Sequence, residues 1–211
     1  MRITVIGSGD IGGALALALS RTHDVTVSGS RLGSESAARV VAESDRRVRE
    51  VPVREGVERA ELVVFSVPWA AVDPVLDAEL VRALRGKILL VVTLPWNETE
   101  TLVLGTTTSG AEYIASRAIG ARVVQAFNTV ASTTVAAPAA HGLPATVIVS
   151  SDDAPARQVV AELARELGFD VVDAGPLRSA RYTEPIAMLY AQLAFESGLG
   201  EDVAFRVLHG S

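Results

Sequence analysis

The chain has 211 residues, of which 49% are hydrophobic, so it can form one full domain with a small appendage and needs no metal or disulfide for stability. Its formal net charge of −6 argues against a general nucleic-acid binder, because phosphate neutralisation needs a basic surface. Cysteine is absent, which excludes disulfides and thiolate sites and suits the reducing environment of the cytoplasm.

The first sixty residues alternate between strand and helix signals. Apolar runs predict buried parallel strands, and a stretch rich in Ala and Leu predicts the helix between them. These elements are expected as a strand over 2–6, a helix over 11–21, a strand over 24–29 and a helix over 34–44 capped by Ser34. Residues 45–59 are charged and contain Pro52, which predicts a loop with one short strand.

The same alternation continues to about residue 139. The elements expected here are a strand over 62–67 ended by Pro68, a helix over 74–84, a strand over 87–94, a helix over 109–118 and a strand over 122–127. The longest apolar run, over 62–72, is interrupted by Ser66 and Pro68 and is too short to cross a bilayer. We therefore expect a soluble α/β protein whose residues 1–139 form a Rossmann-type, doubly wound parallel sheet.

A second strand–helix–strand unit follows. The pattern predicts strands over 145–150 and 169–173, a helix from Asp153 to about Gly168, and a long helix over 177–197. Residues 140–211 should therefore form a small C-terminal α/β lobe that continues the same sheet and covers a second-substrate site. The turn at Asp173–Leu177 is either the floor of that site or a rigid strand-to-helix turn.

A glycine motif directly follows the first strand and opens the first helix. The fingerprint G-x-G-x-x-G is matched by Gly7-Ser8-Gly9-Asp10-Ile11-Gly12. The first glycine allows the tight turn, the second lets a pyrophosphate approach the backbone, and the third lets helix and strand pack closely. The helix N-terminus then offers free N–H groups to the phosphates. A carboxylate is unfavourable there, so Asp10 is expected to cap the helix or to face a second substrate.

The tip of the second strand indicates which dinucleotide is bound. A site for NAD places Asp or Glu there to hold the ribose 2′-OH, whereas this chain has Ser30 and Arg31. A guanidinium can hold a 2′-phosphate in bidentate fashion, which predicts NADP. Ser28 could add a hydroxyl, although its direction along the strand is undetermined. The alternative is a surface turn with a solvated arginine.

Three further loops are expected at the carboxyl ends of strands, where open parallel sheets bind their ligands. Pro68-Trp69 is interpreted as a wall for the nicotinamide, and Pro95-Trp96 follows the next strand in the same way. Both tryptophans could instead simply pack their loops. Asn128, Thr129 and Val130 follow the strand over 122–127, and their polar groups suit a carboxamide or a flavin-like ring. The alternative there is a turn that satisfies its own backbone.

These pieces, taken together, resemble the NADPH-dependent F420 reductase family, the NADP:coenzyme F420 oxidoreductases, and the related NADPH domain of membrane metalloreductases. The resemblance extends to about Arg206 and rests on the glycine motif followed by Gly29-Ser30-Arg31, Val67-Pro68-Trp69, Ala126-Phe127-Asn128-Thr129-Val130 and Asp173-Ala174-Gly175-Pro176-Leu177. It implies that Ser8 to Ile11 hold the pyrophosphate and that Trp69 borders the nicotinamide. It also implies a cytoplasmic homodimer formed through the C-terminal part.

The resemblance implies an enzyme that transfers hydride between NADPH and a deazaflavin (coenzyme F420) or a flavin. Such a transfer needs two stacked rings and little acid–base help, which fits a chain with no evident catalytic acid and no metal-ligand spacing. Phe127-Asn128-Thr129 resembles the metalloreductase version of its loop, so a flavin or ferric reductase is an alternative. Arg178, Arg181 and Arg206 could form a basic rim for an anionic acceptor.

Two different functions would also use an NADP site of this kind. The first is an imine or hydroxyacid dehydrogenase. Hydroxyacid dehydrogenases commonly use a lysine on a helix as the acid, whereas the only lysine here, Lys87, opens a strand. The second is a non-catalytic NADP-binding sensor, which would bind NADPH tightly without turning over any acceptor.

Overall fold

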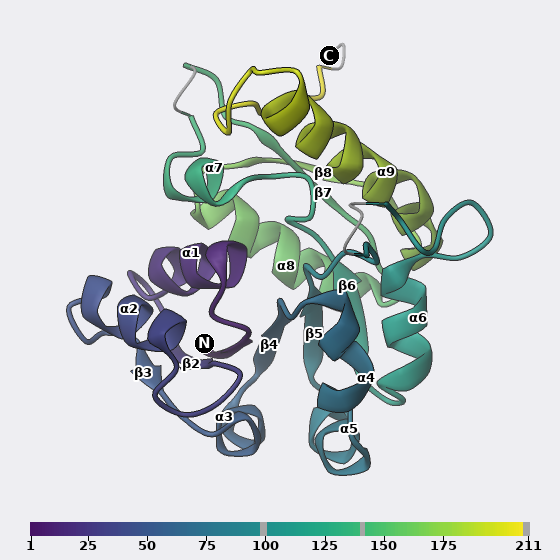
Figure 1. The fold of residues 1–211 in the computed structure, drawn as a ribbon. Helices are drawn as coiled ribbons and strands as arrows, with labels where there is room; N and C mark the ends of the chain where they lie inside the picture. Colours follow the sequence, from purple (N-terminus) through teal and green to yellow (C-terminus); the bar gives the residue numbers. More distant parts are fainter. Residues whose placement is uncertain (98–100, 140–141, 209–211) are drawn as a thin grey trace.

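A six-stranded parallel sheet forms the larger part of the computed structural model, which describes residues 1–97, 101–139 and 142–208 (Figure 1). The strand order is β3-β2-β1-β4-β5-β6, which places the point where the strand order reverses between β1 and β4. The strands are β1 (Arg2–Ile6), β2 (Asp24–Ser28), β3 (Arg49–Glu50), β4 (Leu62–Phe65), β5 (Ile88–Val91) and β6 (Arg122–Gln125). The expected Rossmann-type fold is thus confirmed.

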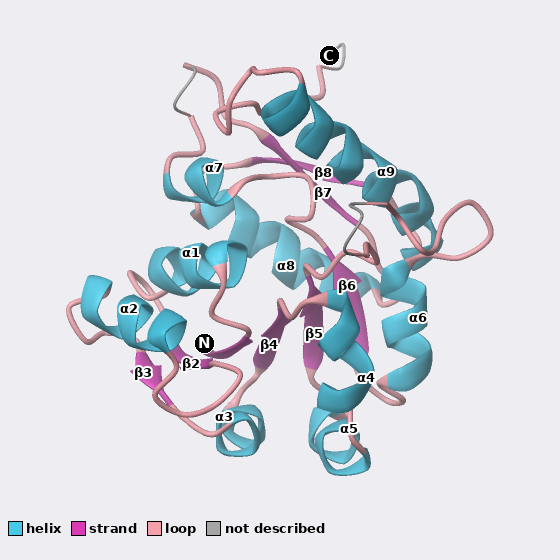
Figure 2. Ribbon diagram, viewed as in Figure 1, coloured by secondary structure: helices cyan, strands magenta, loops and turns pink. Residues whose placement is uncertain are grey.

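Helices connect successive strands and cover both faces of this sheet (Figure 2). They are α1 (Asp10–Leu19), α2 (Glu35–Glu43), α3 (Val53–Arg59), α4 (Val72–Val75), α5 (Ala78–Leu84), α6 (Gly110–Arg117), α7 (Ser132–Ala136), α8 (Ala154–Glu166) and α9 (Ala180–Ala191). Ser34 caps α2 as expected, since its side chain accepts a hydrogen bond from the Ala37 N–H. No helix within the described residues is both long and apolar enough to span a membrane.

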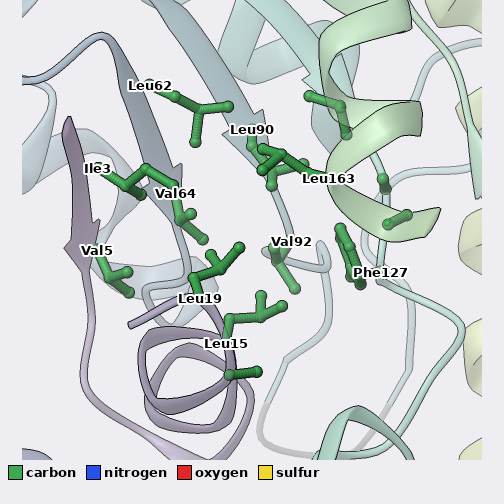
Figure 3. Close-up of a cluster of buried hydrophobic side chains, with 14 of the residues drawn as sticks. Ile3, Val5, Leu15, Leu19, Leu62, Val64, Leu90, Val92, Phe127 and Leu163 are labelled. Carbon is green, nitrogen blue, oxygen red and sulfur yellow. The ribbon is translucent and has the colours of Figure 1, made fainter. Parts of the chain in front are cut away.

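The central strands β4 and β5 are apolar at every position because both of their faces are buried. Register alignment places Val5, Val64 and Leu90 side by side across β1, β4 and β5. Leu15 and Leu19 of α1 pack with this row, and Leu163 of α8 joins the same cluster (Figure 3). A second cluster on the opposite face joins the strands to α3, α5 and α6. Two filled faces leave only the strand ends open to ligands.

Two expected elements differ in the structure. Residues 45–59 are not all loop: Pro52 stands at the N-cap position of α3, where its fixed φ and missing N–H suit a helix start. The expected helix over 74–84 is instead two short helices, α4 and α5. Asp77 separates them, because its carboxylate accepts hydrogen bonds from the N–H groups of Glu79 and Leu80 and so starts a new helix.

The C-terminal unit does not continue the large sheet, contrary to expectation. β7 (Thr146–Val149) and β8 (Asp170–Asp173) form a separate two-stranded parallel sheet. The chain leaving β7 runs antiparallel to β6 and meets it in an isolated bridge between Gln125 and Ser150. That opposite direction rules out another parallel strand at this edge. α8 fills the space between the two sheets, and α9 packs on α6 (Figures 1 and 2).

Candidate functional site

The loops that follow β1, β4, β5 and β6 meet at one edge of the sheet, because these parallel strands all end there. Gly7, directly after β1, lies against the backbone carbonyl of Ser66, directly after β4. The Val67 N–H in turn donates to the Thr93 hydroxyl beyond β5, at 3.1 Å. The predicted ligand loops are therefore brought together at the carboxyl edge, as open parallel sheets generally place them.

The glycine loop has the geometry of a phosphate cradle. Gly7 adopts φ +100°, a conformation that L side chains rarely adopt, and a side chain on Gly12 would overlap the Gly7 carbonyl oxygen. Gly9, in contrast, would direct a Cβ into open space, with no heavy atom within 4 Å. Gly9 is also the N-cap of α1, and no described side chain caps that helix. Open space in front of an uncapped helix N-terminus suits a pyrophosphate.

Asp10 neither caps α1 nor faces another part of the site. It is the first residue of the helix, and its side chain is 85% exposed. Its nearest charged partner is Arg39 of α2, at 3.8 Å. The carboxylate therefore points away toward solvent and α2, which reduces its repulsion of a bound phosphate.

The loop after β2 presents Ser30 and Arg31 on the surface. Both side chains are exposed, and Arg31 forms no ion pair with any residue that the structure describes. The loop is fixed at its far end, where the Gly33 N–H donates to both carboxylate oxygens of Glu50, at 3.0 and 3.1 Å. Ser28 is not available, since its hydroxyl donates to the Val51 carbonyl at 2.8 Å. The unpaired guanidinium of Arg31 therefore lies on a loop that Glu50 holds in place.

A hydroxyl pair joins this loop to the glycine loop. The Oγ atoms of Ser8 and Ser36 lie 2.6 Å apart, and Ser8 is buried. Ser36 belongs to the first turn of α2, directly after the loop that carries Arg31. The contact holds the expected pyrophosphate and 2′-phosphate positions at a fixed separation.

Trp69 is half-buried and packs on Tyr113, a residue that no sequence motif indicated. Its ring lies 5.3 Å from that of Tyr113 of α6, at an angle of 57°. The Tyr113 hydroxyl donates to Asp73 at 2.8 Å, which raises the pKa of the tyrosine. Pro68 beside the tryptophan is exposed. The packing explains how Trp69 is held at the edge, while its contact with a nicotinamide stays a prediction.

Asn128 is the most unusual polar residue at this edge. Only 7% of it is exposed, yet neither its amide nitrogen nor its amide oxygen has a hydrogen-bond partner among the described residues. The preceding Phe127 has φ +61°, rare for an aromatic residue, and its ring is held edge-on by Phe169. Thr129 and Val130 are buried as well. A buried, unpaired amide on a strained loop is costly, which suggests a ligand partner.

Replacing Asn128 with leucine should therefore separate stability from binding. The free energy of unfolding of the cofactor-free protein should stay level or rise by up to about 2 kcal/mol, because an unsatisfied polar group is removed. Affinity for a nicotinamide dinucleotide should fall. Gln125→Leu is the matched control: its buried amide is partnered, so this change should destabilise the protein. Urea denaturation checks both, and a larger loss for Asn128→Leu than for Gln125→Leu would contradict the assignment.

The remaining candidates lie elsewhere or are already engaged. Trp96 is 38% exposed and forms an isolated antiparallel bridge with Leu102. Arg181 donates to both carboxylate oxygens of Glu112, at 2.8 and 2.6 Å, and Arg206 donates to the Pro144 carbonyl. These contacts leave fewer free guanidinium N–H groups with which the expected basic rim could bind an anionic acceptor.

The turn at Asp173–Leu177 is a rigid structural turn. The Asp173 carboxylate accepts from the Gly175 N–H at 2.8 Å, and the Ser179 hydroxyl donates to the Ala174 carbonyl. Leu177 lines a groove with Arg122 and Val123, which begin β6. The turn and the adjacent Arg178 thus lie toward the amino end of β6, away from the carboxyl edge, so the structure does not support a role as substrate floor.

Comparisons with known proteins agree with this geometry. Residues 2–95 match the family described as NADP oxidoreductase, coenzyme F420-dependent. Metalloreductase STEAP3 of Rattus norvegicus is 31% identical over 190 residues, which are 89% of this chain. The chain spans only 36% of the length of that rat protein.

Solved structures show the same relationship. A candidate F420-dependent NADP reductase of Arthrobacter sp. FB24 superposes with a TM-score of 0.88 and 28% identity, covering 99% of this chain and 100% of that one. An imine reductase of Myxococcus stipitatus in complex with NADP+ has a TM-score of 0.67 and 19% identity, covering 94% of this chain and 63% of its own. The second likeness is one of fold alone.

Proposed function

We propose that this chain, which belongs to the family of NADP oxidoreductases described as coenzyme F420-dependent, transfers hydride between NADPH and a deazaflavin such as coenzyme F420, or a flavin. The observation that carries the proposal is the buried, unpaired amide of Asn128 at the same sheet edge as the glycine cradle. The free guanidinium of Arg31 at the tip of β2 specifies the phosphorylated dinucleotide.

The residues present fit NADP from end to end. Ser30 and Arg31 would hold the 2′-phosphate, and the N–H groups that follow Gly9 would hold the pyrophosphate. Asn128 would bind the carboxamide of the nicotinamide, with Trp69 and Val130 beside the ring. The cofactor supplies the hydride, and the protein supplies orientation and exclusion of water. No side-chain acid is required for transfer between two stacked rings.

Flavin or ferric reduction is a second candidate, because the rat protein that is 31% identical to this chain is named a metalloreductase. The two candidates differ in the acceptor and not in the NADPH site. The imine reductase likeness concerns the fold alone and favours no third acceptor.

The acceptor is tested by anaerobic oxidation of NADPH with coenzyme F420, FMN and FAD offered in parallel. Fast bleaching of coenzyme F420 alone is the result expected of a deazaflavin reductase. A preference for FMN or FAD would assign the chain to the flavin reductase class. Tight NADPH binding without turnover on any acceptor would contradict hydride transfer to such rings and favour a sensor or a dedicated substrate dehydrogenase.

The expected cytoplasmic homodimer remains part of this proposal. The outer face of α9 and the turn after it expose Tyr182, Leu189, Phe195 and Leu199 at 72%, 46%, 60% and 62%. From Tyr182 to Leu199 the charged residues are Glu184, which is fully buried, and Glu196, which is exposed. A largely apolar stripe with one exposed charge on an acidic chain suits a second copy of the same stripe.

Leu189→Arg should convert a dimeric protein into a monomer, because it places a charge at the centre of that stripe. Light scattering coupled to gel filtration measures the mass directly. The control is Ile119→Arg, which changes an apolar residue that is 65% exposed and lies on a different element. A wild-type protein that is monomeric, or a variant that stays dimeric, would contradict the assigned surface.

A further inference from the structure

Glu184 is a fully buried carboxylate in the middle of α9. Its Oε2 atom accepts a hydrogen bond from the Gly110 N–H at 2.9 Å. Its Oε1 atom accepts from the Ala111 N–H and from Nε2 of Gln125, both at 3.0 Å. The side-chain amide oxygen of Gln125, Oε1, in turn accepts from the Thr183 hydroxyl at 2.7 Å. One carboxylate thus engages three donors from two elements of the large domain.

These donors lie next to the loops of the candidate site. Gly110 begins α6 and packs tightly on Pro95, since a Cβ on Gly110 would stand 2.8 Å from the proline Cδ. Gln125 ends β6, three residues before Asn128. Glu184 therefore sets the positions of the chain beyond β5 and beyond β6 together, with the strained Phe127 between its anchor and Asn128.

We propose that Glu184 is a positioning residue of the nicotinamide end of the site: its ionised carboxylate holds the two loops beyond β5 and β6 in the geometry that ligand binding and hydride transfer require. The inference rests on the proposed function only in placing the nicotinamide beside Asn128. Glu184 has no exposed surface and does not itself touch the ligand.

Glu184 is close to the midpoint between its ionised and protonated forms at neutral pH. Burial raises the pKa of Glu184 to about 7, against the effect of the three N–H donors that favour the ionised form. The charged group that acts on it is Glu112 of α6, which raises its pKa further and is itself bound to Arg181 of α9. β6 contributes only the neutral Gln125.

Protonation would disturb the anchor because it turns one acceptor into a donor that faces N–H groups. The new O–H finds no acceptor among the three donors, so the carboxyl group or its neighbours must rearrange to satisfy it. Ser150 offers a free hydrogen-bonding group beside Gln125 when these bonds rearrange. It forms a bridged pair with Gln125, so both side chains lie on the same face, and its buried hydroxyl has no partner among the described residues. Below about pH 7 we therefore expect a looser arrangement of the Asn128 loop.

Glu184→Gln removes the titration while keeping the shape. The new amide has one acceptor oxygen in place of two. That oxygen can accept from the Gly110 N–H, while the NH2 group takes the Oε1 position, where the Gln125 amide can rotate to accept from it and the Ala111 N–H loses its partner. The probe is NADPH at saturation, whose emission reports the surroundings of the nicotinamide without any acceptor. The 2′-phosphate titrates near about pH 6 in every variant, so the comparison between variants carries the result.

In the wild-type protein the emission of bound NADPH, and kcat with whichever acceptor turns over, should change between about pH 6 and pH 8 with a midpoint near 7. Glu184→Gln should abolish that step, and Glu112→Gln should move the midpoint to lower pH because it removes a like charge. Glu162→Gln, an exposed carboxylate on α8, is the control and should leave the profile unchanged.

A step that persists in Glu184→Gln, or a wild-type profile without a step, would overturn the positioning role. If Glu184→Gln fails to fold, the shift in Glu112→Gln decides in the same way. A wild-type protein that does not bind NADPH at any pH would overturn the proposed function and, with it, the inference. Binding without the step would overturn the inference alone.

Discussion

Arg31→Ala is expected to weaken NADPH binding by about 100-fold and to leave NADH binding within about threefold of the wild type. The reason is the loss of charge-assisted hydrogen bonds to a 2′-phosphate, which are worth about 2–3 kcal/mol together. Arg31→Lys should lose part of this affinity, since an ammonium keeps the charge but not the bidentate geometry. Fluorescence titration of the wild type and of both variants with the two dinucleotides measures the six affinities.

The control for this variant is Arg21→Ala, which removes an exposed cation from the far end of α1. It should change neither affinity by more than about threefold at physiological salt, because exposed charges beyond a Debye length are screened. An equal loss of NADPH and NADH affinity in Arg31→Ala would show a folding defect or a different binding position. No loss of affinity at all would show that Ser30 and Arg31 form an ordinary surface turn without a role in binding.

Gly9→Ala is expected to abolish measurable dinucleotide binding while the protein keeps its fold. A Cβ at Gly9 meets no protein atom within 4 Å, so the free energy of unfolding should change by less than about 1 kcal/mol. The same Cβ would occupy the space through which a pyrophosphate approaches the backbone. NADPH and NADH should be affected alike, in contrast to Arg31→Ala.

The comparison variant is Gly12→Ala, in which the added Cβ would overlap the carbonyl oxygen of Gly7. That overlap is between backbone and Cβ, which the backbone cannot easily relieve, so it should cost about 3 kcal/mol of stability. Thermal unfolding of the two variants, read beside NADPH titration, separates a packing glycine from a binding glycine. Equal destabilisation in both, or wild-type NADPH affinity in Gly9→Ala, would contradict the cradle as described.

Local patterns were sufficient to predict the sheet and its phosphate loop. The apolar runs at β4 and β5 have no polar face because both faces are buried. The spacing of the glycines is explained by the close backbone contacts at Gly7 and Gly12. The separate sheet of the C-terminal lobe could not be predicted in this way. Its strands have ordinary strand composition, and only the antiparallel path of the chain beyond β7 sets them apart.

Within the site, sequence reasoning found residues that follow strand ends and missed those that support them. Tyr113 packs on Trp69 from 44 positions away in the sequence. Glu50 binds Gly33 in the Arg31 loop from 17 positions away. No local sequence signal links either pair. Glu184 was also missed, because a lone glutamate in an apolar helix looks like a solvated position until its three donors are known. Supporting contacts of this kind arise from tertiary packing.

Direct hydride transfer from NADPH at the carboxyl edge of the sheet is tested most directly by a single turnover with labelled cofactor. The NADPH is deuterated at the transferred position of the nicotinamide, and the acceptor is the one that is reduced fastest. Mass spectrometry should find the deuterium in the reduced acceptor, and Asn128→Leu should slow its transfer. Deuterium recovered in water, or an undiminished rate in Asn128→Leu, would contradict a transfer between two rings held at this site.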